Sequence, residues 1–372
     1  MPGKGLEDII AAETAISDID GKLGRLFYVG YDIHELAPSS TFEEIVYLLH
    51  NLELPSKAQL EELNERLIAE RELDAFVERL MPTMVEQTSP MSMLRTTVSA
   101  MSAYDPDGWD QSTEANYRKA MRLISRFATV IATFHRLRSN EQVLKANPKL
   151  SHAANFLYML TGREPDEEFG RIFDVCLVLH ADHTMNASTF AARVAASTLS
   201  DIHSAVTAAI ATLKGPLHGG ANEAVMKILL QIGSVEKVRD AVKAKLDAKE
   251  KIMGFGHRVY KTEDPRATHL RKLSKQIGEM VGDTRWYEMS LAMEEVVLEE
   301  KGLYPNVDFY AASVYYCLGI PVDLFTPVFA ASRVSGWTAH IREQYADNRL
   351  IRPESAYVGP PHRSYVPIDQ RG

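Results

Sequence analysis

A run of large apolar residues constrains the fold of this chain more than any other feature of its sequence. The run recurs at three- and four-residue spacing and comprises Leu123, Ile124, Phe127, Val130, Ile131 and Phe134. Such spacing places the side chains along one stripe of a helix, whereas a half-buried strand would alternate at every second residue. The pattern therefore predicts one long helix with a broad buried face.

Helix signals dominate the rest of the chain. Thr41-Phe42-Glu43-Glu44 is a capping box that opens a helix through Leu49, and Ser56-Lys57-Ala58-Gln59 opens another. Between glycine and proline breaks, helical patterns cover residues 221–232, 235–250, 266–281, 284–301, 307–318 and 327–345. Only residues 21–33, where glycine interrupts aromatic and β-branched residues, indicate a short β-hairpin. We expect an all-α fold.

The chain has 372 residues, more than one hydrophobic core comfortably supports, so two domains are expected. The breaks delimit a small helical domain at residues 220–319, inserted into a large helical domain formed by residues 1–219 and 320–372. We expect the functional site in the cleft between them. Prolines after Arg349 predict an extended tail, which we expect to wrap over a partner.

Charge and hydropathy narrow the class of protein. Fifty Asp and Glu against 41 Lys and Arg give a formal net charge of −9, which argues against a diffuse basic surface for nucleic acid. No run of about eighteen apolar residues is present, so we expect no transmembrane helix. The first residues lack the apolar stretch of a signal peptide, so we expect a cytoplasmic protein.

Two loops carry a histidine among glycines. His218 lies in Gly215-Pro216-Leu217-His218-Gly219-Gly220, directly ahead of a predicted helix, and His257 follows Gly254 and Gly256. Glycine lets the backbone and the imidazole approach a ligand, and the start of a helix offers free N–H groups. A turn with an incidental polar residue would explain either loop alone, but two such loops in one chain indicate a site.

The segment His180-Ala181-Asp182-His183 raises the question of a metal site. Zinc proteases of the His-Glu-x-x-His type need histidines four residues apart with a Glu beside the first, whereas these are three apart with an Asp. No third cluster of ligands is evident, so we expect no metal. His180 is interpreted as a core histidine that hydrogen-bonds to the backbone.

Two further charged residues stand in apolar surroundings. Asp308 lies at the start of an apolar helix, where an N-cap or first-turn carboxylate is the simplest interpretation. Arg333 interrupts the small and apolar residues of the segment 329–336. A cation there is costly unless it is paired, so we expect it to meet an acid from the protein or from a ligand.

Taken together and in this order, these segments resemble the citrate synthase family over nearly the whole chain. The Gly-Pro-Leu-His-Gly-Gly-Ala-Asn loop, the Gly-x-Gly-His-Arg-Val-Tyr-Lys-x-x-Asp-Pro-Arg loop and the Asn-Val-Asp-Phe-Tyr helix start match its catalytic segments. The Leu-His-Ala-Asp-His stretch matches its oxaloacetate-binding histidine region. Ser89 departs from the family, because a histidine is common at that position. The resemblance is closer to the compact homodimeric form than to the larger hexameric one.

This resemblance implies an enzyme that condenses acetyl-CoA with oxaloacetate and water to give citrate and CoA, with no permanently bound cofactor. Asp308 would be the base, His218 would hydrogen-bond the thioester oxygen, and His257 would protonate the keto oxygen of oxaloacetate. The residues implied in substrate binding are His183, Arg266 and Arg333 for oxaloacetate, Arg352 from the other subunit, Phe329 beside the acetyl group, and Gly254, Gly256 and Lys261 for CoA.

Three alternatives stay open from the sequence. The enzyme could prefer propionyl-CoA and make 2-methylcitrate, since one methylene is worth only about 1–3 kcal/mol in a pocket. A catalytically silent ligand-binding relative is a second alternative, against which the intact His218, His257 and Asp308 argue. A His/Asp metallohydrolase is the third, and its ligand spacing is poor.

Overall fold

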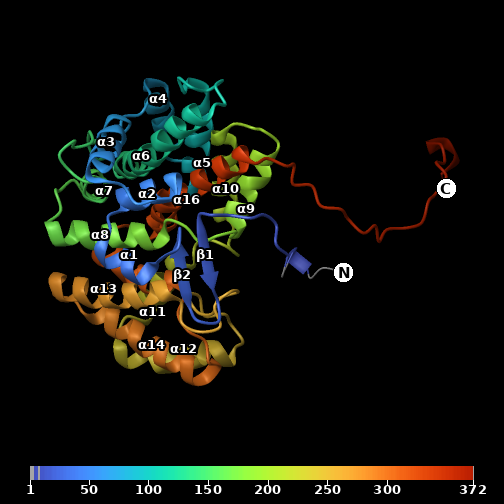
Figure 1. Cartoon of the computed structure of the whole chain (residues 1–372). Coiled ribbons are helices and arrows are strands. Elements are labelled where there is room, and N and C mark those ends of the chain that lie inside the picture. Colours follow the sequence, from blue (N-terminus) through green and yellow to red (C-terminus); the bar gives the residue numbers. More distant parts are fainter. Residues whose placement is uncertain (1–3, 7–8, 372) are drawn as a thin grey trace.

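The protein, described by a computed structural model over residues 4–6 and 9–371, is built almost entirely of helices (Figure 1). The upper group in that view contains the first ten helices and the last one. Their bounds are α1 (Ile33–Ser39), α2 (Phe42–Asn51), α3 (Lys57–Ala69), α4 (Ala75–Met84), α5 (Pro90–Met101), α6 (Thr113–Arg138), α7 (His152–Thr161), α8 (Glu167–His180), α9 (Ala187–Ser197), α10 (Ile202–Leu213) and α16 (Phe325–Ala346). The all-α prediction is confirmed.

A second group of helices gathers at the lower end of Figure 1. It consists of α11 (Ala221–Ile232), α12 (Val238–Asp247), α13 (Pro265–Val281), α14 (Arg285–Lys301) and α15 (Val307–Cys317). These helices pack mainly on one another, with α15 between α11 and α13. The group coincides with the predicted insertion at residues 220–319, and its status as a separate domain remains a prediction.

A small antiparallel sheet near the N-terminus replaces the predicted hairpin. Its strands, in the order β1-β2-β3, are β1 (Ser17–Asp20), β2 (Arg25–Tyr28) and β3 (Tyr31–Asp32). The prediction of β-structure within residues 21–33 is confirmed, but the start was wrong because β1 precedes it. Aspartate has a low β-propensity, so the aspartates at positions 18 and 20 make β1 hard to recognise as a strand. Pairing with β2 stabilises it.

Helix boundaries follow the local signals closely. Thr41 and Ser56 are the N-caps of α2 and α3, each in a complete capping box. The predicted helix 235–250 was too long, because a short 3-10 turn (Val235–Lys237) precedes α12 and the helix ends at Asp247. The other 3-10 turns are Lys4–Leu6, Ser102–Tyr104, Val322–Leu324 and Ile368–Gln370.

Helix α16 runs through the middle of the upper group, where it packs against α2, α6, α8, α9 and α10. It is buried along most of its length, which explains why its sequence lacks one clear apolar stripe. It starts at Phe325, two residues before the predicted Pro327, because proline fits in the first turn of a helix. No helix in the described part of the chain is long and apolar enough to cross a lipid bilayer.

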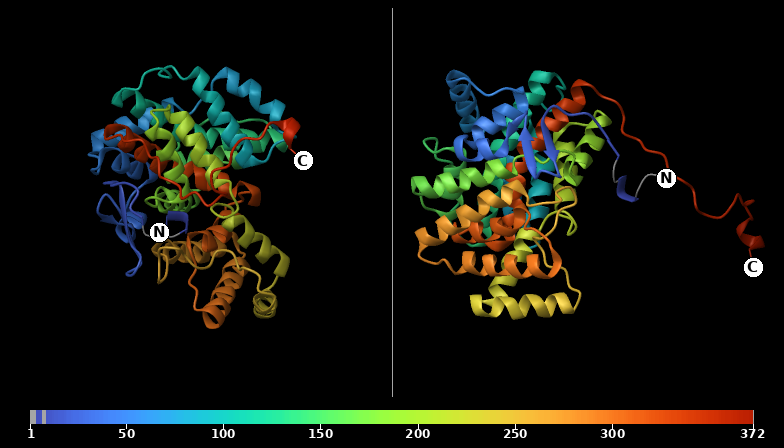
Figure 2. Two further views of the ribbon diagram at one scale, coloured as in Figure 1. Left: turned by 90° about the vertical axis from the view of Figure 1, so that its right-hand side faces the viewer. Right: turned by 60° about the horizontal axis from the view of Figure 1, so that its bottom comes forward.

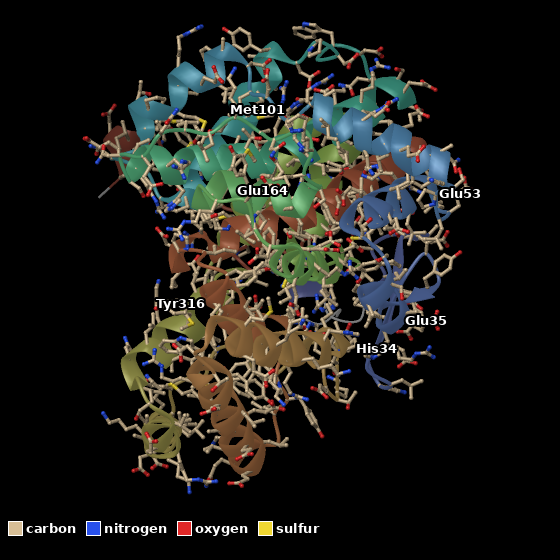
Figure 3. The ribbon with its side chains drawn as sticks, turned by 90° about the vertical axis from the view of Figure 1, so that its left-hand side faces the viewer. His34, Glu35, Glu53, Met101, Glu164 and Tyr316 are labelled. Carbon is tan, nitrogen blue, oxygen red and sulfur yellow. The ribbon has the colours of Figure 1, made fainter. Side chains whose placement is uncertain are left out.

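The two groups of helices touch through α1, α8 and α13. His34, on α1, lies at this junction in Figure 3, and its Nδ1 is 2.9 Å from Nε2 of His269 on α13. At the other end of the chain, residues 347–351 still contact α9 through Ser197, and the residues that follow leave the body as an extended arm (Figures 1 and 2). The predicted extended tail is therefore confirmed.

Candidate active site

The loop between α10 and α11 holds His218 in a fixed orientation. A Cβ at Gly219 would lie 2.1 Å from the carbonyl oxygen of Leu213, so only glycine allows this close return of the chain. The backbone N–H of Ser188, at the start of α9, donates to Nε2 of His218 over 3.2 Å. Nε2 also lies 2.8 Å from the Ser188 hydroxyl, which donates to Oδ1 of Asn186. Because a backbone N–H can only donate, we assign Nε2 as its acceptor and place the proton of the neutral imidazole on Nδ1.

In His257 the other ring nitrogen accepts hydrogen bonds from the backbone. Its Nδ1 accepts the backbone N–H of Val259 at 3.0 Å and that of Tyr260 at 3.2 Å. Two donors on Nδ1 leave the proton on Nε2, which faces away from this backbone turn. The loop thus presents a neutral imidazole with a free Nε2–H.

Electrostatics keep both imidazoles uncharged. Burial, followed by the positive charge of Arg333, lowers the pKa of His218 to about 4. Burial and the positive charge of Arg266 lower the pKa of His257 to about 4, although Asp264 acts in the other direction. At neutral pH the site therefore contains two hydrogen-bond donors that carry no charge.

His183 lies beside His257, with 5.1 Å between the ring centroids, and its Nε2 is 3.2 Å from the hydroxyl of Tyr260. Its loop is fixed by the buried carboxylate of Asp182, which accepts the N–H of Thr184 at 3.0 Å and lies 3.3 Å from Nε2 of His340. Helix α16 approaches this carboxylate so closely that a Cβ at position 336 would be 2.4 Å from it. A glycine there lets α16 and the His183 loop meet.

Asp308 occupies the first turn of α15. The N-cap is Asn306, whose side-chain oxygen accepts the N–H of Asp308 at 3.1 Å, so the simpler first-turn interpretation holds and the N-cap one was wrong. Its carboxylate receives no hydrogen bond from the described residues. Burial raises the pKa of Asp308 to about 6, against the lowering influence of Arg266 and Arg333. This carboxylate is thus available as a base near neutral pH.

Two buried arginines flank these groups and differ in their partners. Arg266 forms a two-pronged ion pair with Asp264, at 3.0 and 2.7 Å. Arg333 donates from Nε to the carbonyl of His180 at 2.7 Å and lies over the ring of Phe329 at 4.7 Å. Among the described residues no carboxylate lies within 4.0 Å of Arg333, and burial lowers the pKa of its guanidinium to about 10. An anionic ligand would supply the missing partner.

Comparisons with known proteins agree with this geometry. A sequence model of the family described as "Citrate synthase, C-terminal domain" matches residues 5–354. Citrate synthase 2 of Bacillus subtilis (strain 168) is 50% identical over 369 residues, which are 99% of this chain and 99% of that protein. The chain belongs to the citrate synthase family.

Two further members of the citrate synthase family extend the comparison. The citrate synthase of Haloferax volcanii is 50% identical over 377 residues, covering 99% of this chain and 98% of that protein. The citrate synthase of Thermoplasma acidophilum, solved as a ternary complex with carboxymethyl coenzyme A and oxaloacetate, is 35% identical with a TM-score of 0.93, and 99% of each chain is covered.

The glycine loop ahead of His257 also positions Asp308. The carbonyl of Gly254 accepts the N–H of Asn306 at 2.9 Å, and the N–H of Gly256 donates to the carbonyl of Tyr304 at 2.9 Å. This pairing ties the start of α15 to the His257 loop, so a shift of one segment would move the other. Lys261, further along the loop, is exposed and donates its backbone N–H to Gly21 in the turn of the sheet.

The structure gathers most, but not all, of the residues that the sequence singled out. His183, His218, His257 and Asp308 each lie close enough to Arg266 or Arg333 for the arginine charge to lower their pKa. Arg352 lies apart from them, exposed on the arm. Within the described residues, no group of three or more His, Cys, Asp or Glu side chains is placed to hold a metal ion. His180 is a buried core histidine whose Nδ1 is 2.7 Å from the carbonyl of Cys176, as predicted.

Sequence reasoning missed the residues that hold the site together. Asp264 pairs with Arg266 and also accepts the N–H of Val307 at 3.1 Å, so it joins α13 to α15. An N-cap signal was available for it, since Asp264 precedes Pro265 at the first helical position. Ser188 carried no comparable signal, because its contact with His218 joins segments thirty residues apart.

Proposed function

We propose that this member of the citrate synthase family condenses acetyl-CoA with oxaloacetate and hydrolyses the product to citrate and CoA. One observation carries the proposal: two neutral histidines, held by backbone N–H groups in opposite tautomers, lie near a half-buried carboxylate that accepts no hydrogen bond from the described residues. Such a set supplies one base and two uncharged acids in one site.

The first step is removal of a proton from the methyl group of acetyl-CoA. The methyl group of a thioester is a poor carbon acid, so proton removal requires both a base and stabilisation of the oxygen where charge develops. The Asp308 carboxylate takes the proton, and His218 donates Nδ1–H to the thioester oxygen. His218 is neutral and donates through its single N–H. The product of this step is therefore an enol or a hydrogen-bonded enolate.

The second step joins the two carbons. The enol carbon attacks the keto carbon of oxaloacetate, while His257 passes its Nε2 proton to the keto oxygen, which becomes the hydroxyl of citryl-CoA. Water then cleaves the thioester, giving the new carboxylate of citrate and the thiol of CoA. His257 regains a proton from the water that cleaves the thioester, and Asp308 releases the proton that it removed, so one proton per cycle returns to solvent.

Oxaloacetate carries two carboxylates, for which the site offers Arg333, Arg266 and His183. Arg333 is the strongest candidate, because it is a buried cation without an acidic partner among the described residues. Phe329, whose ring lies beneath the Arg333 guanidinium, would lie near the acetyl group. Gly254, Gly256 and Lys261 are proposed CoA contacts.

We also propose a cytoplasmic homodimer in which Arg352 reaches the site of the partner subunit. The extended arm supports this proposal: Tyr357, Val358 and Tyr365 are 79%, 94% and 79% exposed in the single chain. Apolar and aromatic side chains in such a row are normally covered, and a second copy of the chain would cover them.

Release of free thiol tests the proposed reaction. Purified protein in EDTA is mixed with oxaloacetate and either acetyl-CoA or propionyl-CoA at matched concentrations. Faster release from acetyl-CoA is expected and supports citrate formation. Faster release from propionyl-CoA would assign 2-methylcitrate instead, and no release from either donor would overturn the condensing function.

A further inference from the structure

A cavity of about 290 Å³ lies away from the proposed active site, between the ends of α2 and α16 and the start of α6. These helices are neighbours in the upper group of Figure 1. Helix α16 serves both places, with Arg333 at the active site and Arg342 at the cavity. The two positions are nine residues apart, which corresponds to about 13 Å along the helix axis, so the cavity is a separate site.

Arg342 is the only arginine that lines this cavity, and its charge has no counter-ion in the described part of the chain. Its Nη1 donates to Nδ1 of His50 at 2.9 Å and to the carbonyl of His50 at 3.0 Å, and both acceptors are uncharged. Its Nε is buried without a hydrogen-bond partner, and its guanidinium lies 4.8 Å from the centre of the Tyr117 ring. The carbonyl at the end of α2 offsets only part of a full positive charge.

The titratable groups around the cavity do not neutralise Arg342. Glu343 also lines it, but its carboxylate is engaged with Arg193 at 2.5 Å and with the N–H of Ala15 at 2.8 Å. Burial and the charge of Arg342 hold the pKa of His50 well below its usual value, so this histidine is neutral. The hydroxyl group of Tyr345 is neutral and donates a hydrogen bond to the carbonyl of Ser200 at 2.5 Å.

A second unsatisfied polar group lines the same cavity. Asn116 is 3% exposed, and its side-chain oxygen is buried without a partner, while its amide nitrogen donates to the carbonyl of Gln111. The Asn116 oxygen is an acceptor and would not contact an anion, so Arg342, a half-buried cation with no carboxylate partner among the described residues, is the group that calls for one. Gln111 and Thr113 bring the start of α6 to the cavity wall, and the positive end of the helix dipole favours negative charge there.

We propose that this cavity binds a small anion, a carboxylate or a phosphate, that pairs with Arg342. Its volume lies at the lower end of the range for ligand pockets, which suits a compact metabolite and excludes a whole CoA molecule. The remaining wall is formed by Ile16, Leu49, Leu52, Ala339 and Ala346, so the occupant presents one charged end and a short apolar part.

Calorimetric titration of the full-length protein with inorganic phosphate, and separately with succinate, tests the site. Besides any anion held by Arg333 in the proposed active site, we expect the wild type to bind one anion per chain that Arg342→Gln binds at least about tenfold more weakly, since a hydrogen bond to a charged group is lost. Arg66→Gln is the matched control. The Arg66 guanidinium also lies over the Tyr117 ring, 5.5 Å from its centre, but Arg66 does not line the cavity. Arg333→Gln removes an arginine of the proposed active site and leaves the cavity intact. This variant is therefore expected to keep the binding that depends on Arg342.

The two probes distinguish the sources of the anion, and binding of either one through Arg342 supports the proposal. Arg342→Lys keeps the positive charge and is expected to retain part of the affinity, which guards against a folding defect in the glutamine variant. Thiol release by Arg342→Gln is expected to match the wild type. Equal affinity in the wild type and Arg342→Gln, or no binding of either probe to the wild type, would overturn the proposal.

Discussion

The backbone N–H of Ser188 lies 3.2 Å from Nε2 of His218 and thereby fixes which side of the imidazole carries the proton. At His257 the backbone donors lie on the other ring nitrogen, because the N–H groups of Val259 and Tyr260 donate to Nδ1. Backbone donors cannot move away or titrate, so each tautomer is built into the fold. The two histidines therefore differ in the nitrogen that carries the proton, although both are neutral.

Amide substitutions distinguish these two orientations. The side-chain nitrogen of Asn falls near Nδ1 of a histidine, and that of Gln near Nε2. We expect His218→Asn to be more active than His218→Gln, and His257→Gln to be more active than His257→Asn. All four are expected to lose about 10²–10⁴-fold in kcat. Steady-state thiol release checks the ranking, and the same preferred amide at both positions would contradict it.

The pH dependence of the reaction follows from Asp308. Its pKa is raised to about 6, and the base must be ionised, so kcat/KM is expected to fall about tenfold per pH unit below 6. The two neutral histidines do not interfere, because their pKa values lie near 4. Asp308→Asn is expected to lose about 10²–10⁴-fold in kcat together with this acidic limb. A limb that persists unchanged in the variant's residual activity would assign it to another group.

The two site arginines are expected to have opposite effects on stability. Removing Arg266 leaves the buried Asp264 without its partner, so Arg266→Gln is expected to cost about 3–5 kcal/mol of unfolding free energy. Removing Arg333 discards a buried charge without an acidic partner, so Arg333→Met is expected to leave stability unchanged or raise it by up to about 2 kcal/mol. Both variants are expected to bind oxaloacetate more weakly.

Urea unfolding of the ligand-free protein measures this difference. Arg25→Gln serves as the control, since the ion pair of Arg25 with Asp32 is half exposed and is expected to contribute about 1 kcal/mol or less. A large loss of stability in Arg333→Met would show that a protein carboxylate, and not a ligand, is its partner.

The protein is expected to lose stability in mild acid. Burial lowers the pKa of at least five histidines to about 3 or 4, namely His152, His180, His218, His257 and His269. Between about pH 6.5 and 4 the unfolded chain binds protons at these positions and the folded chain does not, so stability falls as pH falls. Asp174 and Asp308, with pKa values raised to about 7 and about 6, act in the opposite direction but are outnumbered.

Urea unfolding at pH 7.5, 6.5 and 5.5 checks the sign of this effect. One histidine contributes at most about 1.4 kcal/mol per pH unit, so His269→Gln is expected to flatten the dependence by up to that amount. His269 is suitable because it lies at the junction of the helix groups, away from the substrate-binding residues. Unfolding free energies that stay constant or rise toward pH 5.5 would contradict the prediction.

Complementation between two inactive variants tests the role of the arm. If Arg352 acts in the partner's site, a mixed dimer of Arg352→Ala and Asp308→Asn chains has one intact site, formed by Asp308 of the first chain and Arg352 of the second. Random association of equal amounts is expected to restore about a quarter of the wild-type activity. No recovery in verified mixed dimers would show that Arg352 does not act across the interface.

Local signals predicted the helices well, because caps, prolines and apolar spacing act within a few residues. Thr41 and Ser56 marked helix starts, and the stripe from Leu123 to Phe134 marked α6. Strand β1 escaped notice because its order comes from pairing with β2. In the site, the histidines and Asp308 stood out by their glycine-rich or apolar neighbours. The contacts of Ser188 and Asp264, which orient those residues, depend on tertiary packing that no short sequence window contains.

Nitrogen NMR of the ligand-free protein, with labelled histidines and assignment through the His218 and His257 variants, tests the central claim most directly. The account predicts two neutral imidazoles at pH 7, with the proton on Nδ1 in His218 and on Nε2 in His257. An imidazolium at either position at pH 7, or the same tautomer at both, would contradict it.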